Sequence, residues 1–340
     1  MRVLVTGGCG FIGSNVVQKH LNSGHRVTVL DNLSRRGTPK NLEWLKSLGD
    51  FNFVKDDVRN ASRILRLLKI TRFDLIVHLA GQVAVTTSVV DPRTDFEINA
   101  LGTLNVLEAM RITRSQGLLI YASTNKVYGE MMEAKITEAK NHVRYRDYTR
   151  GIRETFPLDF HSPYGCSKGA ADQYMRDYSR IYGLHTVVFR QSCVYGERQF
   201  GVEDQGWVAH FMIQVHFGRP LKIYGDGKQV RDVLYIGDLL EAYDRAWKKK
   251  RLSSGKIYNI GGGAKNQISL LELIALLRNW RGEKIRPSFH PARPGDQRIY
   301  VSDNSKLLKD LGWKVTTDFD RGFAKLYRWI EDHQGILMPR

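Results

Sequence analysis

The fold is decided by the stretch Arg2-Val3-Leu4-Val5-Thr6-Gly7-Gly8-Cys9-Gly10-Phe11-Ile12-Gly13. Its apolar beginning predicts a buried strand, and the apolar periodicity from residue 11 to about residue 21 predicts a helix. Between them, three glycines follow the spacing G-x-x-G-x-x-G, which in this strand–turn–helix context is typical of a dinucleotide pyrophosphate site. Glycine allows a tight turn and a close approach of the backbone to phosphate. We therefore expect a cofactor to be bound by Gly7, Gly10, Phe11, Ile12 and Gly13.

A carboxylate follows the second predicted strand, residues 26–30. Asp31 can accept hydrogen bonds from both hydroxyls of an adenosine ribose and would repel the 2′-phosphate of NADP, so the sequence favours NAD. Asn32 is expected to contact the same nucleoside. Arg35 and Arg36 could argue for NADP, but they lie beyond the strand in a loop with Gly and Pro. We interpret these two arginines as solvated loop charges.

Strands alternate with helices over most of the chain. Apolar strands are predicted at 51–54, 75–79, 118–122 and 186–190, and helices at about 91–114 and from residue 163 onward. This alternation predicts an α/β fold with a Rossmann-like doubly wound parallel sheet. A smaller, interleaved α/β substrate lobe follows, with strands around 221–224 and 257–260 and helices at about 238–248, 270–280 and 319–331. We expect the Rossmann domain to comprise residues 1–193 plus about 231–262, and the substrate lobe about 194–230 plus 263–340.

Ligands of such a sheet lie at the carboxyl ends of its strands. The residues after the predicted strands are therefore expected to face the same crevice as the glycine turn. For the cofactor they are Asp57, Val58, Leu79, Ala80, Gly81 and Ser123, together with Asn99 from the helix at 91–114. His78 lies on a buried strand, where a packed histidine is more common than a catalytic base.

A tyrosine and a lysine stand four residues apart at the start of the helix that Ser162 and Pro163 open. At this spacing Tyr164 and Lys168 share one helix face, so the ammonium can stabilise a phenolate and lower a pKa that is about 10 in water. A tyrosine tuned in this way takes a proton from a substrate hydroxyl near neutral pH. We expect the hydroxyl of Thr124, at the end of the fifth strand, on the other side of the substrate.

The composition limits the classes of partner that the protein is expected to bind. Of 340 residues, 42% are hydrophobic, and no apolar run is long enough to span a bilayer, so we expect a cytoplasmic protein without a membrane partner. Three scattered cysteines are too few for a disulfide framework or a metal cluster, and no metal is expected. The net charge of +17 could favour binding of nucleic acid, but the basic residues are spread along the chain and do not form one patch in the sequence. An anionic small-molecule substrate is an equally economical use of the arginines.

These motifs together resemble the extended short-chain dehydrogenase/reductase family of nucleotide-sugar enzymes. The resemblance includes the glycine turn, Asp57-Val58, His78-Leu79-Ala80-Gly81, Ser123-Thr124 with Val127-Tyr128-Gly129, Tyr164 with Lys168, and Val230-Arg231-Asp232, and it covers nearly the whole chain. It implies that Thr124 helps activate a sugar hydroxyl, that Tyr164 is the acid/base, and that Lys168 lowers its pKa and holds the nicotinamide ribose. It also implies a tightly held NAD that is not consumed.

The residues after Thr124 distinguish the reactions of this family. Hexose dehydratases carry an Asp-Glu pair there, because elimination of water needs a further acid and base. This chain has Asn125-Lys126, which leaves epimerisation. Longer stretches, at residues 81–88, 123–129, 160–175 and 204–208, are similar to the C2-epimerases of CDP-activated sugars, which convert CDP-paratose to CDP-tyvelose. Cys193 replaces the asparagine that usually precedes Val-Tyr-Gly.

The expected substrate is thus a nucleotide diphosphate sugar, with a CDP-sugar favoured, and not a nucleic acid. Its expected contacts are Gln82, Thr86, Ser88, Thr124, Asn125, Cys193, Arg198, Gln205, Trp207, Arg231 and Arg293. The polar segment 130–159 is predicted as a long loop that covers a site or contacts another subunit. The resemblance implies a homodimer or homotetramer packed through the helices at about 91–114 and 163–182. Two alternatives stay open: a UDP-sugar C4-epimerase, and an inactive NAD-sensing or nucleic-acid-associated regulator.

Overall fold

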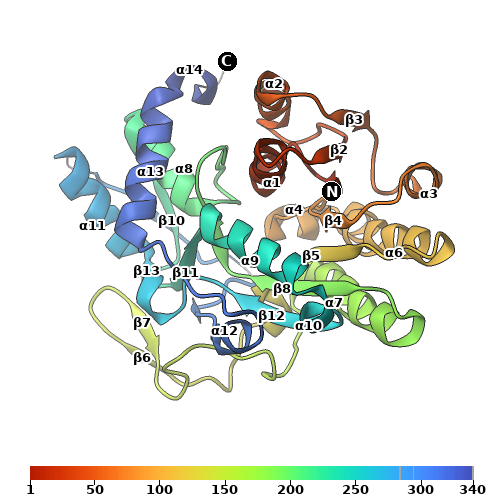
Figure 1. The fold of residues 1–340 in the computed structure, drawn as a ribbon. Helices are drawn as coiled ribbons and strands as arrows, with labels where there is room; N and C mark the ends of the chain where they lie inside the picture. Colours follow the sequence, from red (N-terminus) through yellow and green to blue (C-terminus); the bar gives the residue numbers. More distant parts are fainter. Residues whose placement is uncertain (283–284, 294, 339–340) are drawn as a thin grey trace.

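A seven-stranded parallel sheet forms the centre of the protein. The structure is a computed structural model that describes residues 1–282, 285–293 and 295–338. The strand order is β12-β8-β5-β4-β1-β2-β3, and every pairing is parallel, which confirms the predicted doubly wound α/β fold (Figure 1). The strands are β1 (Arg2–Thr6), β2 (Arg26–Asp31), β3 (Asn52–Lys55), β4 (Leu75–His78), β5 (Leu118–Thr124), β8 (Thr186–Gln191) and β12 (Lys256–Ile260).

Helices cover both faces of this sheet because its strands are apolar on both sides. In β1, Val3 and Val5 belong to one hydrophobic cluster and Leu4 to the other. The first cluster includes residues of α1 (Phe11–Asn22), α2 (Thr38–Leu48) and α9 (Ile236–Lys248), and the second includes residues of α3 (Ala61–Ile70), α6 (Gly102–Ile112) and α7 (Ser162–Tyr182). Strand order reverses at β1, between β2 and β4, so a crevice opens at the carboxyl ends of these strands.

The smaller lobe is built on a second sheet in which β11 is central. It comprises β9 (Cys193–Tyr195), β11 (Val230–Tyr235), β13 (Gln267–Ser269) and β15 (Ile299–Tyr300), and a further parallel pair is formed by β10 (Lys222–Tyr224) and β14 (Ser288–His290). The remaining helices of this half are α8 (Trp207–His216), α10 (Lys250–Ser253), η3 (Ala264–Asn266), α11 (Leu270–Arg281), α12 (Ser305–Leu311), α13 (Phe319–Asp332) and α14 (Gln334–Leu337).

The proposed division into domains stays a prediction. Within it, α9 and β12 join the central sheet, as expected for residues of about 231–262. Strand β11 overlaps the start of that range but pairs with β9, β13 and β15 in the smaller sheet. In the part of the chain that the structure describes, no helix is long and apolar enough to cross a membrane.

The helix predicted at about 91–114 is divided. After α4 (Val85–Val90), the chain forms α5 (Pro92–Phe96), a π-helical turn η1 (Glu97–Leu101) and then α6. Gly102 allows the close packing here, since a Cβ at this position would lie 2.8 Å from a methyl carbon of Val58. Periodicity alone does not reveal a π-helical turn, because the apolar positions on either side of it remain helical.

The segment 130–159 does not cover the site, contrary to that part of the prediction. It contains a two-stranded antiparallel hairpin, β6 (Ile136–Glu138) and β7 (Val143–Tyr145), seen at the lower edge of Figure 1. Val143, Tyr145 and Ile152 belong to an apolar cluster with Val230 of β11 and Tyr300 of β15. The segment therefore packs against the smaller sheet, and its contribution to burial was hidden by its many charged residues.

A buried ion pair between β8 and α7 helps to hold the carboxyl end of β5 in position. The guanidinium of Arg190 donates to both carboxylate oxygens of Asp172 at 2.9 Å, and a third nitrogen donates to the hydroxyl of Tyr128 at 3.0 Å. Ser123, which precedes Thr124, donates to the same carboxylate at 2.9 Å. Both charged side chains are almost completely buried. The network therefore ties α7 and β8 to the strand end that carries Thr124.

We expect Arg190→Met to lower the free energy of unfolding by about 3–5 kcal/mol, because it leaves the carboxylate of Asp172 buried without its counter-charge. Urea denaturation of the purified protein measures the change. Arg93→Met is the matched control, since Arg93 forms an exposed ion pair with Glu97 at 2.9 Å and its loss should cost about 0.5 kcal/mol or less. Equal losses for the two variants would contradict the role assigned to the buried pair.

Candidate active site

A cavity of about 570 Å³ lies at the carboxyl ends of the central strands and continues to the smaller lobe. Its walls include the glycine turn, the ends of β2, β4 and β5, the start of α7, residues of β9 and β11, and residues 293 and 296. Of the residues predicted for the cofactor, all line this cavity except Asn99. The position agrees with the rule that ligands of a doubly wound sheet bind where the strand order reverses.

The glycine turn has room for backbone only. Gly7 has a φ of +69°, and a Cβ there would lie 2.6 Å from the amide nitrogen of Ala80. A Cβ at Gly13 would lie 2.1 Å from the carbonyl oxygen of Gly7. Gly10 precedes α1 with extended backbone, no side chain caps that helix, and its first turn has no acidic residue. The N-terminal amides of α1 thus suit an anionic diphosphate, which fits a dinucleotide.

Asp31 stands where the ribose of a dinucleotide would be recognised. Its carboxylate accepts from the amide of Cys9 at 2.9 Å and from that of Leu33 at 2.8 Å, which fixes its orientation. Burial raises the pKa of Asp31, and the two backbone donors oppose that shift. Beside it, the side-chain amide of Asn32 donates to Asp57 at 2.8 Å. The polar groups predicted for the nucleoside therefore form one connected wall.

Tyr164 and Thr124 both line the cavity and lie next to each other. Tyr164 lies in the first turn of α7, where its backbone amide donates to the hydroxyl of Ser88 at 3.1 Å. Burial raises the pKa of Tyr164 to about 12, while the neighbouring Thr124 hydroxyl opposes the shift. A phenol and an alcohol placed in this way can exchange a proton with a substrate hydroxyl between them.

The expected effect of Lys168 on Tyr164 stays a prediction. The ammonium of Lys168 donates to the carbonyl oxygen of Ala122 and lies 4.2 Å from the ring centre of Tyr121. Burial lowers the pKa of Lys168 to about 7, although Asp95 and Asp172 oppose this. Burial is thus the largest cause of the pKa shift of both side chains. A bound NAD would supply a hydride acceptor beside Tyr164 and a ribose for Lys168.

Most of the predicted substrate contacts line the cavity. Trp207 donates to the thiol of Cys193 at 3.3 Å, so this cysteine is a packed acceptor. The guanidinium of Arg293 lies 3.7 Å from the ring centre of Tyr224 and is held by Glu203 at 3.1 Å and Asp204 at 3.0 Å. The predicted residues in these walls are Thr86, Thr124, Asn125, Cys193, Arg198, Gln205, Trp207, Arg231 and Arg293.

Three predicted residues lie behind the cavity wall. The side chain of Gln82 turns back to the backbone of Ala84, and Ser88 is buried with its hydroxyl directed to the backbone of Val85 and Tyr164. Asn99 accepts from the amide of Gln82 at 3.0 Å and donates to Asp95. All three satisfy backbone groups of the wall, so they shape the site without lining it. His78 is packed between the hydroxyls of Thr6 and Thr103.

Other residues of the wall had no signal in the sequence. Arg35 and Arg36 are exposed, as the interpretation as solvated loop charges expects, but they also line the cavity, and Arg35 donates to Gln205. Lys126, Tyr224 and Asp296 also line it. These residues come from loops and strand ends whose paths depend on how the lobes pack.

Comparison with known proteins agrees with this geometry. The family model described as GDP-mannose 4,6 dehydratase matches residues 4–326. CDP-paratose 2-epimerase of Salmonella typhi is 47% identical over 334 residues, which cover 97% of this chain and 99% of that protein.

Two solved structures are similar over almost the whole chain. UDP-glucose 4-epimerase of Thermotoga maritima with UDP-glucose has a TM-score of 0.85 at 31% identity and covers 98% of this chain and 100% of its own. UDP-glucuronic acid 4-epimerase of Bacillus cereus, in complex with UDP-glucuronic acid and NAD, has a TM-score of 0.84 at 29% identity, covering 98% and 99%.

We expect Tyr164→Phe to lower turnover by about 10²–10⁴-fold, the usual contribution of a positioned acid/base, while NAD remains bound. Turnover and the NAD content of the purified protein are measured together. Tyr174→Phe on the same helix is the control, because Tyr174 is half exposed and does not line the cavity. A near wild-type rate for Tyr164→Phe would remove this phenol from the mechanism.

Proposed function

Because the chain belongs to the GDP-mannose 4,6-dehydratase family of NAD-dependent nucleotide-sugar enzymes, we propose that it inverts carbon C2 of a CDP-activated sugar. CDP-paratose, converted to CDP-tyvelose, is the favoured substrate, with CDP-glucose or related nucleotide hexoses as further candidates. The observation that carries this proposal is the 47% identity with CDP-paratose 2-epimerase over 97% of the chain.

The residues of the cavity support an oxidation followed by a reduction. A bound NAD would accept a hydride from C2 and return it to the opposite face after the 2-keto sugar has turned over within the cavity. Tyr164 would take the proton of the C2 hydroxyl, with Thr124 as its hydrogen-bonding neighbour, and would return it to the oxygen. The hydride that the sugar loses is returned to it within one turnover, so a tightly held NAD is not consumed.

Dehydration is disfavoured by the two residues after Thr124. Asn125 cannot donate a proton as an acid would, and its amide is already bonded to Gln297 at 3.0 Å. Lys126 lines the cavity with its ammonium on the carbonyl oxygen of Gly295 at 2.9 Å. Neither residue supplies the carboxylate pair with which elimination of water is performed in the dehydratases.

The test is to incubate the purified protein, without added cofactor, with CDP-paratose, CDP-glucose, GDP-glucose and UDP-glucose in deuterated water. Proton NMR should show the C2 epimer of the CDP-sugars, with the C2 proton retained because it returns from the cofactor. The most rapidly converted substrate identifies the base. Replacement of the C2 proton by deuterium would show that this hydrogen leaves as a proton, and it would contradict hydride transfer.

Two other results would contradict the proposed function and would favour another one. C4 epimers as the main products would identify a UDP-sugar type C4-epimerase. No conversion of any of the four nucleotide sugars, even with added NAD, would favour a protein that binds the dinucleotide without turnover.

We also propose that the protein is a homo-oligomer, with a dimer as its basic unit, and that it is cytoplasmic. Apolar side chains that are substantially exposed occur along η1, α6 and α7, the helices implied by the family resemblance. They are Leu101, Ile112, Tyr174, Ile181 and Tyr182. Water-exposed apolar groups on adjacent helices are the type of surface that a subunit interface covers.

Ile181→Glu should shift the protein from dimer toward monomer, because it would bury a charge in the proposed interface. Sedimentation velocity measures the assembly state. Leu308→Glu is the matched control, since Leu308 is half exposed on α12, which packs against α9, α10 and β12. Monomeric wild-type protein, or dimers of unchanged stability in Ile181→Glu, would contradict this interface.

A further inference from the structure

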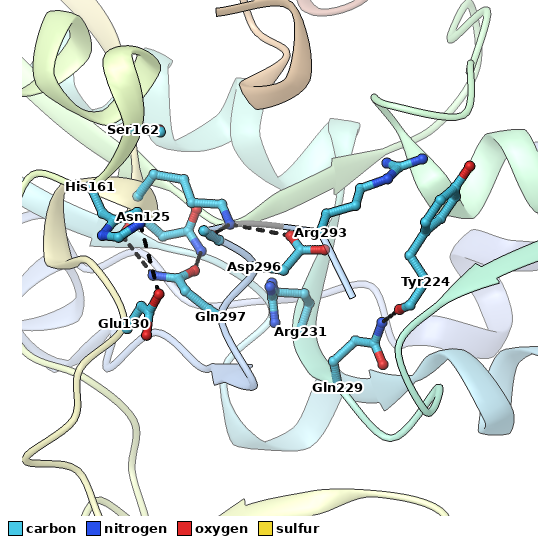
Figure 2. Close-up of polar contacts among 12 residues, drawn as sticks. Asn125, Glu130, His161, Ser162, Tyr224, Gln229, Arg231, Arg293, Asp296 and Gln297 are labelled. Atoms are coloured by element: carbon cyan, nitrogen blue, oxygen red, sulfur yellow. Dashed lines mark hydrogen bonds and ion pairs between the residues drawn. The ribbon is translucent and has the colours of Figure 1, made fainter. Parts of the chain in front are cut away.

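The loop that carries Arg293 is fastened directly to the residues that follow Thr124. We call residues 293 and 295–297 the arginine loop. Asn125 donates to the side-chain oxygen of Gln297 at 3.0 Å, and Gln297 donates to the carbonyl oxygen of Gly129 at 2.6 Å. Figure 2 shows Asn125 beside Gln297, with Arg293 extending from the same loop toward Tyr224. Residues 172 positions apart in the sequence thus form one polar junction.

Lys126 makes a second attachment. Its ammonium donates to the carbonyl oxygen of Gly295 at 2.9 Å and lies 3.6 Å from the carboxylate of Asp296. On the other side, a Cβ at Gly295 would lie 3.2 Å from the ring of His161, and Gly295 has a φ of +74°. The arginine loop is therefore held between Lys126 and His161, with a backbone conformation that few other residues adopt.

Burial makes this junction rigid. Gln297 is 1% exposed and Asn125 is 7% exposed, so an amide that lost its partner would remain without water. Leaving a buried donor or acceptor unsatisfied costs about 1–3 kcal/mol, so the bonded arrangement is strongly preferred. The position of the arginine loop relative to Thr124 is accordingly well defined.

Arg293 is the charged group that this junction positions. Its guanidinium lines the cavity and is now engaged by the carboxylates of Glu203 and Asp204. A guanidinium binds phosphate in the same bidentate manner as carboxylate, so the diphosphate of a nucleotide sugar can replace these two partners. The distance from Arg293 to the Thr124–Tyr164 pair then determines how deeply the sugar enters.

We propose that Asn125 and Lys126 are positioning residues that set the distance between the diphosphate contact at Arg293 and the acid/base pair, and thereby select C2 as the reacting carbon. This inference rests on the proposed function. C2 is bonded to the anomeric carbon that bears the diphosphate, whereas C4 lies across the ring. A diphosphate held close to the acid/base pair presents C2, and a looser attachment lets the sugar shift until C4 reaches the same place.

The experiment measures the ratio of C2 to C4 epimers formed from CDP-glucose by NMR, for wild type, Asn125→Ala, Lys126→Met and Lys126→Arg. We expect the ratio to fall at least about tenfold in Asn125→Ala and Lys126→Met, a change that corresponds to about 1.4 kcal/mol between the two transition states. Lys126→Arg keeps the charge and the donors and should retain most of the selectivity.

Lys228→Met is the matched control. Lys228 lies in the smaller lobe, as the arginine loop does, and its ammonium pairs with the carboxylate of Glu138 at 3.4 Å rather than with the arginine loop. It should keep the wild-type ratio. If Lys126→Met does not fold, Lys126→Gln replaces it, since glutamine retains a donor for Gly295 but loses the attraction to Asp296.

An unchanged C2 to C4 ratio in both Asn125→Ala and the uncharged Lys126 variant, with only total turnover reduced, would overturn the positioning role while leaving C2 epimerisation established. Absence of the C2 epimer in the wild type would instead overturn the proposed function and this inference with it.

Discussion

The close contact within the glycine turn is the constraint on which the rest of the site depends. A Cβ at Gly13 would lie 2.1 Å from the carbonyl oxygen of Gly7, and one at Gly7 would meet the backbone of Ala80. With glycine at both places, β1, α1 and the end of β4 come together as backbone against backbone. The amides at the start of α1 then face the cavity, and Asp31 on the neighbouring strand faces the same space.

Burial and charge compete at the acid/base pair. The cavity excludes water from Tyr164 and Lys168, which raises the pKa of the phenol to about 12 and lowers that of the ammonium to about 7. Burial therefore favours the neutral form of both groups in the protein without ligands.

The two lobes share one structural unit at the reacting centre. Thr124 ends a strand of the central sheet, and the next two residues hold the arginine loop of the smaller lobe. Ser123, which precedes Thr124, donates a hydrogen bond to Asp172, and Asp172 forms a buried ion pair with Arg190. The group that we propose to bind a diphosphate and those that we propose to move a proton are thus connected through a few buried hydrogen bonds. A single hydrogen-bonded network thus positions the groups proposed for both ends of the substrate, so two separate networks are not needed.

The features that are local in the chain could be predicted from the sequence: the glycine spacing, the acidic residue that ends β2, and the tyrosine and lysine one helical turn apart. Each is set within a single strand, turn or helix, so residue spacing is enough to predict it. Only the tertiary structure decided that Gln82, Ser88 and Asn99 lie behind the wall, that Arg35 reaches the cavity, and that Asn125 meets Gln297. The physical reason is that burial and contacts between distant loops depend on how the whole chain packs, which no local spacing encodes.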